Sequence, residues 1–297
     1  MRPARNRPPK LEPGRGISQP AAAPTEAQLV ERAKLAGAGA SGGPGPTELR
    51  RHVERLVAGD RGALGELVPL AGVTVSDAWA VITKTFGATA ESPVIDPACT
   101  VAGIRTAVAR VREVAARGER VALACARPAA LLTLHLSFAR LAREHGGEVP
   151  DLDDCGPIRA DGRSPRWLRW VGGVAVVTDG EALCGTREGE AAREWMFAIA
   201  RPALVVADGP FAEVAWEHGI EVVTCAGLER PGLAVAATHL GRCTVVPLRT
   251  DRPARSYEVL ERIVASGSPP DAPSGPPPDP SADGPALDPT VDPTVEM

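Results

Sequence analysis

The sequence predicts an α/β fold with a largely parallel sheet flanked by helices. Three observations support this class. Short apolar runs alternate with helical segments after residue 91, the runs are continuous in Val, Ala and Leu, and glycines end most of the helical segments. Such continuous runs are typical of strands buried on both faces, and their alternation with helices is typical of a parallel sheet.

The composition divides the chain into four regions. Residues 1–24 and 267–297 are rich in Pro, Gly, Ser and charged residues, and they are predicted to be disordered because they cannot bury enough apolar surface to offset chain entropy. Residues 25–90 are predicted to form a small helical region. Residues 91–266 are predicted to form the α/β domain.

The helical region has four segments with helical patterning, at 24–37, 47–60, 62–72 and 74–88. Thr47 and Thr74 are expected N-caps. Gly37, Gly39 and Gly42 match the G-x-G-x-x-G pattern of dinucleotide sites. That pattern requires a preceding strand and a following helix. Here a helix precedes it and "PGP" follows, so a linker is favoured.

The α/β domain opens with a helix in which Asp96 is the cap, Pro97 is the first helical residue and Gly118 is the stop. A hairpin is expected to turn at Gly172–Gly173. In chain order, strands are expected at 120–126, 148–152, 167–178 (the hairpin), 203–208, 220–226 and 243–248, and helices at 96–118, 128–146, 188–200, 210–219, 232–241 and 256–264.

The composition limits the expected binding partners and the expected cellular compartment of the protein. The net charge is −4, and no arginine stripe interleaves with aromatics, so no nucleic-acid partner is expected. No apolar stretch reaches about 18 residues and no secretory signal is present, so no membrane partner is expected. The six cysteines are scattered without C-x-x-C pairs, which favours reduced thiols in a cytoplasmic protein over a disulfide framework or a zinc cage.

A candidate site is predicted from two similar strings, "VVTDGEAL" and "VVADGPFA". Ligands of open α/β sheets bind beyond the carboxyl ends of the strands. If their strands are neighbours, Asp179 and Asp208 are expected to act as catalytic residues and to share Mg²⁺ as metal ligands. Arg127 is expected to bind phosphate in a bidentate contact. The remaining predicted phosphate-binding residues are Thr178, Gly180 and Gly209. The alternative is that Asp-Gly is ordinary turn chemistry at both places.

Two further strings resemble phosphatase motifs. "CTVAGIRT" is a C-x₅-R-T string with Cys99, Arg105 and Thr106, but the predicted helix starts before Cys99 and turns Arg105 away from it. "DLDDC" at 151–155 resembles the D-x-D motif of haloacid dehalogenase-type phosphatases, but it lacks a strong preceding strand and a downstream lysine. The histidines at 135, 145, 218 and 239 lie within or at the ends of predicted helices, where surface or dipole-facing roles are favoured.

Whole phrases also resemble an actinobacterial protein family that carries the name phosphatase. The phrases are "PVIDPACTVAGIRTAV", "VALACARPAALL", "VGGVAVVTDGEALCG" and "ALVVADGPFAEVAWEHGIEVV", and the resemblance spans about 91–250. Members have a sequence closer to "TGRP" at 125–128 and lack a cysteine corresponding to Cys99. The resemblance implies hydrolysis of a phosphoester.

The sequence therefore leaves two functions open. The first is a phosphatase that hydrolyses the phosphoester of a small molecule at the carboxyl edge of a Rossmann-like sheet, with assistance from Mg²⁺. The second is a non-catalytic α/β module that binds a nucleotide, a sugar phosphate or a protein partner.

Overall fold

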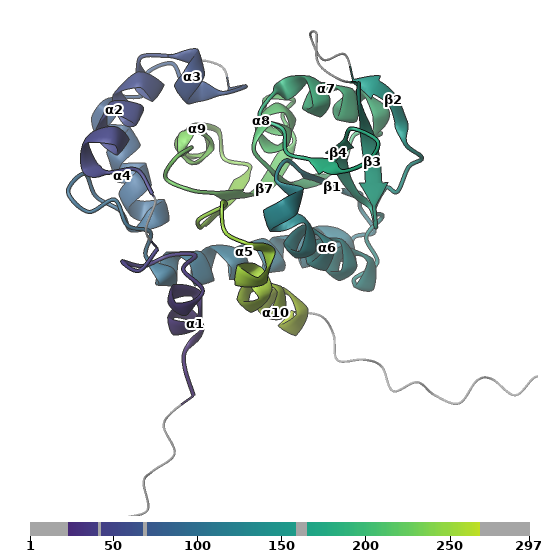
Figure 1. Ribbon diagram of the computed structural model, residues 1–297, viewed down its shortest axis with the longest axis horizontal. Helices are drawn as coiled ribbons and strands as arrows, with labels where there is room; N and C mark the ends of the chain where they lie inside the picture. Colours follow the sequence, from purple (N-terminus) through teal and green to yellow (C-terminus); the bar gives the residue numbers. More distant parts are fainter. Residues whose placement is uncertain (1–22, 41–42, 68–69, 159–164, 268–297) are drawn as a thin grey trace, which may run out of the picture.

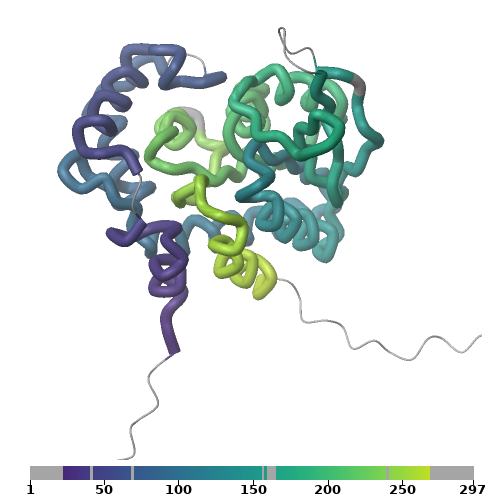
Figure 2. Tube along the Cα trace, viewed as in Figure 1, coloured from purple at the N-terminus to yellow at the C-terminus, as the bar shows by residue number. Residues whose placement is uncertain are grey.

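A computed structural model confirms the α/β class and describes residues 23–40, 43–67, 70–158 and 165–267. Almost all of both predicted tails lies outside these residues. The described part holds one eight-stranded sheet with helices on both faces (Figure 1). Figure 2 shows that the first and last described segments of the chain lie near each other, below the sheet.

The sheet has the order β2-β3-β4-β1-β6-β7-β8, with the short β5 paired to β4. Strands β1, β4, β6, β7 and β8 are parallel, whereas β3 is antiparallel to both β2 and β4. The strands are β1 (Val121–Cys125), β2 (Cys155–Ile158), β3 (Arg166–Val171), β4 (Val174–Thr178), β5 (Leu183–Cys184), β6 (Leu204–Asp208), β7 (Glu221–Ala226) and β8 (Cys243–Pro247).

Two groups of helices cover the sheet. Helices α5 (Pro97–Ala116), α6 (Pro128–Glu144) and α10 (Glu258–Ser266) pack together on one face, and α7 (Gly189–Ala198) and α8 (Pro210–Glu217) pack together on the other. Helix α9 (Gly232–Leu240) links β7 to β8, and a 3₁₀ turn at Ala254–Tyr257 precedes α10. None of the helices in the described ranges has both the length and the apolarity needed to cross a bilayer.

The predicted helical region is present and packs against the α/β part. Its helices are α1 (Glu26–Arg32), α2 (Pro46–Val57), α3 (Arg61–Leu64) and α4 (Val75–Phe86). Helix α4 contacts α9, and α1 contacts α5 (Figure 1). One continuous apolar core includes side chains from both parts, such as Leu56, Phe86 and Val222. The helical region is therefore fixed against the carboxyl half of the chain.

Most predicted boundaries are confirmed, and three are wrong. Thr74 forms a capping box and Asp96 caps α5. Thr47 is not a cap, because Pro46 occupies the first helical turn and Gly45 becomes the N-cap. The expected helix at 62–72 is reduced to the single turn α3. The expected strand at 148–152 is only an isolated bridge at Glu148, and the edge strand β2 forms later.

The contact of α5 with β8 depends on a glycine. A Cβ atom at Gly103 would lie 2.8 Å from Cδ of Pro247 and 2.9 Å from the carbonyl oxygen of Val245. Nearby, the Thr100 hydroxyl donates to the Pro247 carbonyl at 2.6 Å, so the helix is held close to the strand. The absence of a side chain at Gly103 permits this approach.

We expect Gly103→Ala to destabilise the fold by about 1–3 kcal/mol and to lower Tm by roughly 2–10 °C, because the added methyl overpacks against the β8 backbone. Thermal unfolding by circular dichroism measures this change. Gly39→Ala is the matched control, because nothing lies within 4 Å of its added Cβ. Helix propensity alone would favour alanine at position 103 by about 1 kcal/mol, so a more stable variant would contradict the packing argument.

Candidate functional site

The direction of the sheet connections reverses between β1 and β6. The chain passes from β1 through α6, β2 and β3 to β4 on one side, and from β6 through β7 to β8 on the other. Ligands of open α/β sheets bind in the crevice outside the carboxyl ends of the strands at such a reversal. Arg127 and Gly209, two predicted phosphate-binding residues, follow β1 and β6 at this point.

A buried carboxylate joins the two strand ends. Oδ1 of Asp208 accepts a hydrogen bond from the backbone N–H of Ala126 at 2.8 Å. Gly209 then adopts φ 56° and ψ −137°, which only glycine reaches without strain, and a Cβ there would lie 3.2 Å from Cβ of Ala126. Asp208 and Gly209 therefore set the path of the β1–α6 turn that carries Arg127.

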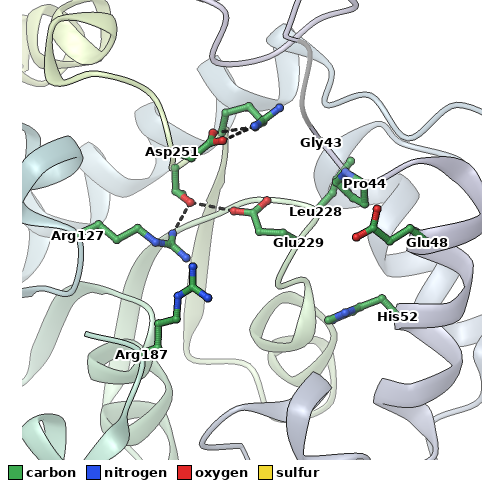
Figure 3. Close-up of a pocket in the computed structure, with 11 residues that line it drawn as sticks. Gly43, Pro44, Glu48, His52, Arg127, Arg187, Leu228, Glu229 and Asp251 are labelled. Atoms are coloured by element: carbon green, nitrogen blue, oxygen red, sulfur yellow. Dashed lines mark hydrogen bonds and ion pairs between the residues drawn. The ribbon is translucent and has the colours of Figure 1, made fainter. Parts of the chain in front are cut away.

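One of several adjoining cavities lies beside this turn, between the strand ends and α2. It has a volume of about 300 Å³. Figure 3 shows Arg127 and Arg187 extending into it from the α/β side, and Glu48 and His52 extending from the opposite side. The full lining is Gly43, Pro44, Glu48, His52, Arg127, Arg187, Leu228, Glu229, Arg249, Thr250 and Asp251.

Three arginines line this cavity together with three carboxylates, Glu48, Glu229 and Asp251. Arg127 also lines three neighbouring cavities, one of which adds Arg61 and Arg230. The exposed Arg187 guanidinium makes no hydrogen bond or ion pair within the described part of the chain, so its donors are available to a ligand. Guanidinium groups match the geometry of phosphate oxygens. Arg127 and Arg187 therefore supply the kind of donors that a phosphate group would need.

Arg127 is held in position from both ends. Its backbone forms the N-cap of α6, and its Nη1 donates to the hydroxyl of Thr250. That hydroxyl in turn donates to Oε1 of Glu229 at 2.9 Å (Figure 3). The first turn of α6 lines an adjoining cavity of about 770 Å³, and the positive end of the helix dipole favours an anion there.

His52 on α2 was not predicted as a site residue. It lines two of these cavities, and its buried Nε2 has no hydrogen-bond partner among the described residues. Burial, followed by the charges of Arg55 and Arg230, lowers its pKa below the usual 6.5. His52 is therefore neutral at pH 7, with a ring nitrogen available to accept a proton. No local sequence signal marks it, because its role depends on how α2 packs against the sheet.

The residues at 178–180 form a tight turn between β4 and β5. The Thr178 hydroxyl donates to the Ala182 carbonyl and accepts from the Gly180 N–H. Oδ1 of the exposed Asp179 accepts from the N–H groups of Glu181 and Ala182, and these bonds lower the pKa of Asp179. None of the four cavities described above includes these residues. This geometry matches the turn alternative for the first Asp-Gly pair.

Asp179 and Asp208 lie at the same edge of the sheet, but their strands are not neighbours. Strand β1 lies between β4 and β6, so the two strand axes are roughly 10 Å apart. Asp208 is completely buried, whereas Asp179 is exposed beyond the end of β4. The condition for a shared site, that the two strands are neighbours, is therefore not met, because β1 pairs with both β4 and β6. A catalytic or metal-binding role for either aspartate stays a prediction.

The two alternative motifs lie away from the cleft. Cys99 is in the first turn of α5, and Arg105 is an exposed helical residue that pairs with Glu26. The "DLDDC" string ends at Cys155, the first residue of β2, and its residue Asp154 pairs with Arg169. Neither string forms a loop around an anion, as the early helix start at Asp96 predicts for the first of them.

We expect Cys99→Ser to leave phosphoester hydrolysis unchanged. Burial and the nearby Asp96 raise the pKa of the Cys99 thiol, so the thiol stays protonated and is a poor nucleophile. The measurement is the hydrolysis rate of an aryl phosphate by the wild type and the variant, with circular dichroism as the folding control. Complete loss of hydrolysis in a folded variant would restore the thiol mechanism.

The fold and cleft define a class: an α/β protein with a crevice lined by arginines and carboxylates at the reversal of its sheet. Residues 26–267 match the model of the protein family described as Phosphatase. The chain therefore belongs to this family, which confirms the resemblance and extends it through the helical region. The protein named Phosphatase SCO2771 of Streptomyces coelicolor is 28% identical over 246 residues, covering 76% of this chain and 88% of the relative. No solved structure gives a significant match.

Proposed function

We propose that this protein hydrolyses the phosphoester of a small molecule in the cleft between α2 and the carboxyl ends of β1, β7 and β8. The observation that supports this most directly is the meeting of two arginines and a neutral histidine, namely Arg127, Arg187 and His52, around one cavity. Membership of the Phosphatase family supports the reaction class.

The chemistry divides between binding and proton transfer. Arg127 and Arg187 bind the phosphate oxygens and stabilise the charge of the transition state. A water molecule attacks phosphorus and transfers its proton to Nε2 of His52, and the bond from phosphorus to the ester oxygen breaks. The leaving oxygen takes up one proton, which His52 returns directly or through water, so the products are inorganic phosphate and an alcohol. The Thr250–Glu229 hydrogen bond keeps Arg127 in place during this step.

Assistance by Mg²⁺ through Asp179 and Asp208 is the sequence prediction. The carboxylates that line the cavity of Arg127, Arg187 and His52 are instead Glu48, Glu229 and Asp251. Asp179→Asn distinguishes these two arrangements. A large loss of Mg²⁺-stimulated hydrolysis would support the sequence prediction, and retained hydrolysis would leave Asp179 with its turn role.

The test is release of phosphate from a generic aryl phosphate by the chelator-treated full-length protein, with and without added Mg²⁺. We expect turnover by the wild type and competitive inhibition by inorganic phosphate. Binding of phosphate without any turnover, with and without Mg²⁺, would contradict the proposal and support the non-catalytic binding module.

A further inference from the structure

We propose that Cys125, His135 and Asp208 together bind one divalent transition-metal ion of the Zn²⁺ class beneath the cleft. This inference is separate from the proposed hydrolysis. The three side chains come from the end of β1, the second turn of α6 and the end of β6. They are the one group of three such side chains in the described ranges whose potential ligand atoms all lie within 4.8 Å of one another.

The distances are close to those of a metal site. Nε2 of His135 and Oδ1 of Asp208 are 3.7 Å apart. Bonds of about 2.0–2.3 Å to zinc in tetrahedral geometry place ligand atoms roughly 3.3–3.8 Å apart. Side-chain shifts of about 1 Å bring the widest pair of the group, at most 4.8 Å apart, into this range. The three residues supply three ligands of a four-coordinate site.

The hydrogen bonds of His135 leave the correct nitrogen available. Nδ1 lies 2.9 Å from the carbonyl oxygen of Leu131, and because a carbonyl only accepts, Nδ1 carries a proton. In the neutral ring Nε2 then presents a lone pair to the Asp208 carboxylate. Two acceptors facing each other repel unless a cation lies between them. A backbone carbonyl that fixes the tautomer is also the usual second-shell partner of a metal-binding histidine.

Asp208 supplies an independent observation. Its side chain is 0% exposed, and Oδ2 has no hydrogen-bond partner among the described residues. A buried carboxylate oxygen without a partner is costly. A divalent ion would satisfy it, and together with the Cys125 thiolate and the Asp208 carboxylate it would give a group of zero net charge. Such a group suits an interior in which Cys125 is 0% and His135 2% exposed.

The types of ligand atom in this group favour Zn²⁺ over Mg²⁺. Thiolate and imidazole favour Zn²⁺ and similar ions, whereas Mg²⁺ prefers carboxylates, carbonyls and water. Binding replaces the proton of the Cys125 thiol with the metal: the S–H bond breaks, the S–metal bond forms and the proton leaves to solvent. No electron is transferred. Asp208 already accepts a hydrogen bond from the Ala126 N–H. A metal ion that holds Asp208 would therefore also hold the turn that carries Arg127.

The test uses the full-length chain, freed of metal by chelator in denaturant and refolded with Co²⁺, with Zn²⁺ or without metal. We expect one Co²⁺ per chain after desalting, with thiolate-to-cobalt charge-transfer absorption. We also expect Zn²⁺ to raise Tm by roughly 5–10 °C when free metal is a hundred times Kd. Cys125→Ser should abolish the charge-transfer band and weaken binding at least about 10–100-fold.

Cys243→Ser is the matched control, because Cys243 also lies on a strand of the sheet but outside the group. It should keep the band and the Tm shift. The proposal fails if the wild type retains no metal, in which case the contact of His135 with Asp208 alone explains the cluster. It also fails if the band survives Cys125→Ser. If Cys125→Ser does not fold, wild-type metal content and the near-isosteric Asp208→Asn decide the outcome.

Discussion

Replacing Arg127 by alanine is expected to reduce kcat/KM for an aryl phosphate by about 10²–10³-fold, because one preorganised donor to the transition-state oxygens is lost. Arg127 is well placed for this role. It forms the N-cap of α6 and lies at the sheet reversal, and Thr250 and Glu229 hold its side chain. The measurement is steady-state hydrolysis, with circular dichroism to confirm the fold.

Two further variants make the Arg127 test specific. Arg127→Lys keeps the positive charge but loses the bidentate geometry, so it should recover only part of the activity. Arg140→Ala removes an exposed arginine from the same helix, outside every cavity described, and should leave kcat/KM unchanged. Equal rates for the wild type and Arg127→Ala would remove phosphate binding from this residue and require another location for the site.

The fold was predictable where local chemistry dominates. Asp96 and Pro97 start α5 as expected, and Gly172 and Gly173 turn the hairpin with φ angles of 57° and 86°. Prediction failed where two local signals compete. At the start of α2, Pro46 overrides Thr47 as the boundary. Before β2, Pro150 interrupts the expected strand at 148–152, and only Glu148 makes a bridge.

The candidate site was predictable only in part. The rule that ligands bind at strand ends selects Arg127 and Gly209 without knowledge of strand order. Whether Asp179 and Asp208 lie side by side depends on the strand order. Local sequence patterns do not reveal that β1 lies between β4 and β6. The same Asp-Gly phrase consequently has two environments: an exposed turn at Asp179 and a buried link between strands at Asp208.

His52→Gln is expected to lower kcat/KM by about 10²–10⁴-fold, the usual contribution of a positioned general base. The wild-type rate should also fall as pH decreases through the pKa of His52, because only the neutral ring accepts a proton. Since burial, Arg55 and Arg230 lower that pKa, the acidic limb of the pH–rate profile should lie below pH 6.5. His218→Gln, at the end of α8, should leave both the rate and the limb unchanged.

Arg55→Gln tests whether the acidic limb belongs to His52. Arg55 lines none of the cavities described and pairs with Asp60 at 2.6 Å. Removing its positive charge, and freeing the negative charge of Asp60, should both raise the pKa of His52. The acidic limb of kcat/KM should therefore move to higher pH while the rate at high pH stays near that of the wild type. A limb that stays in place in Arg55→Gln, or that persists in His52→Gln, would assign the titration to another group and remove His52 as the base.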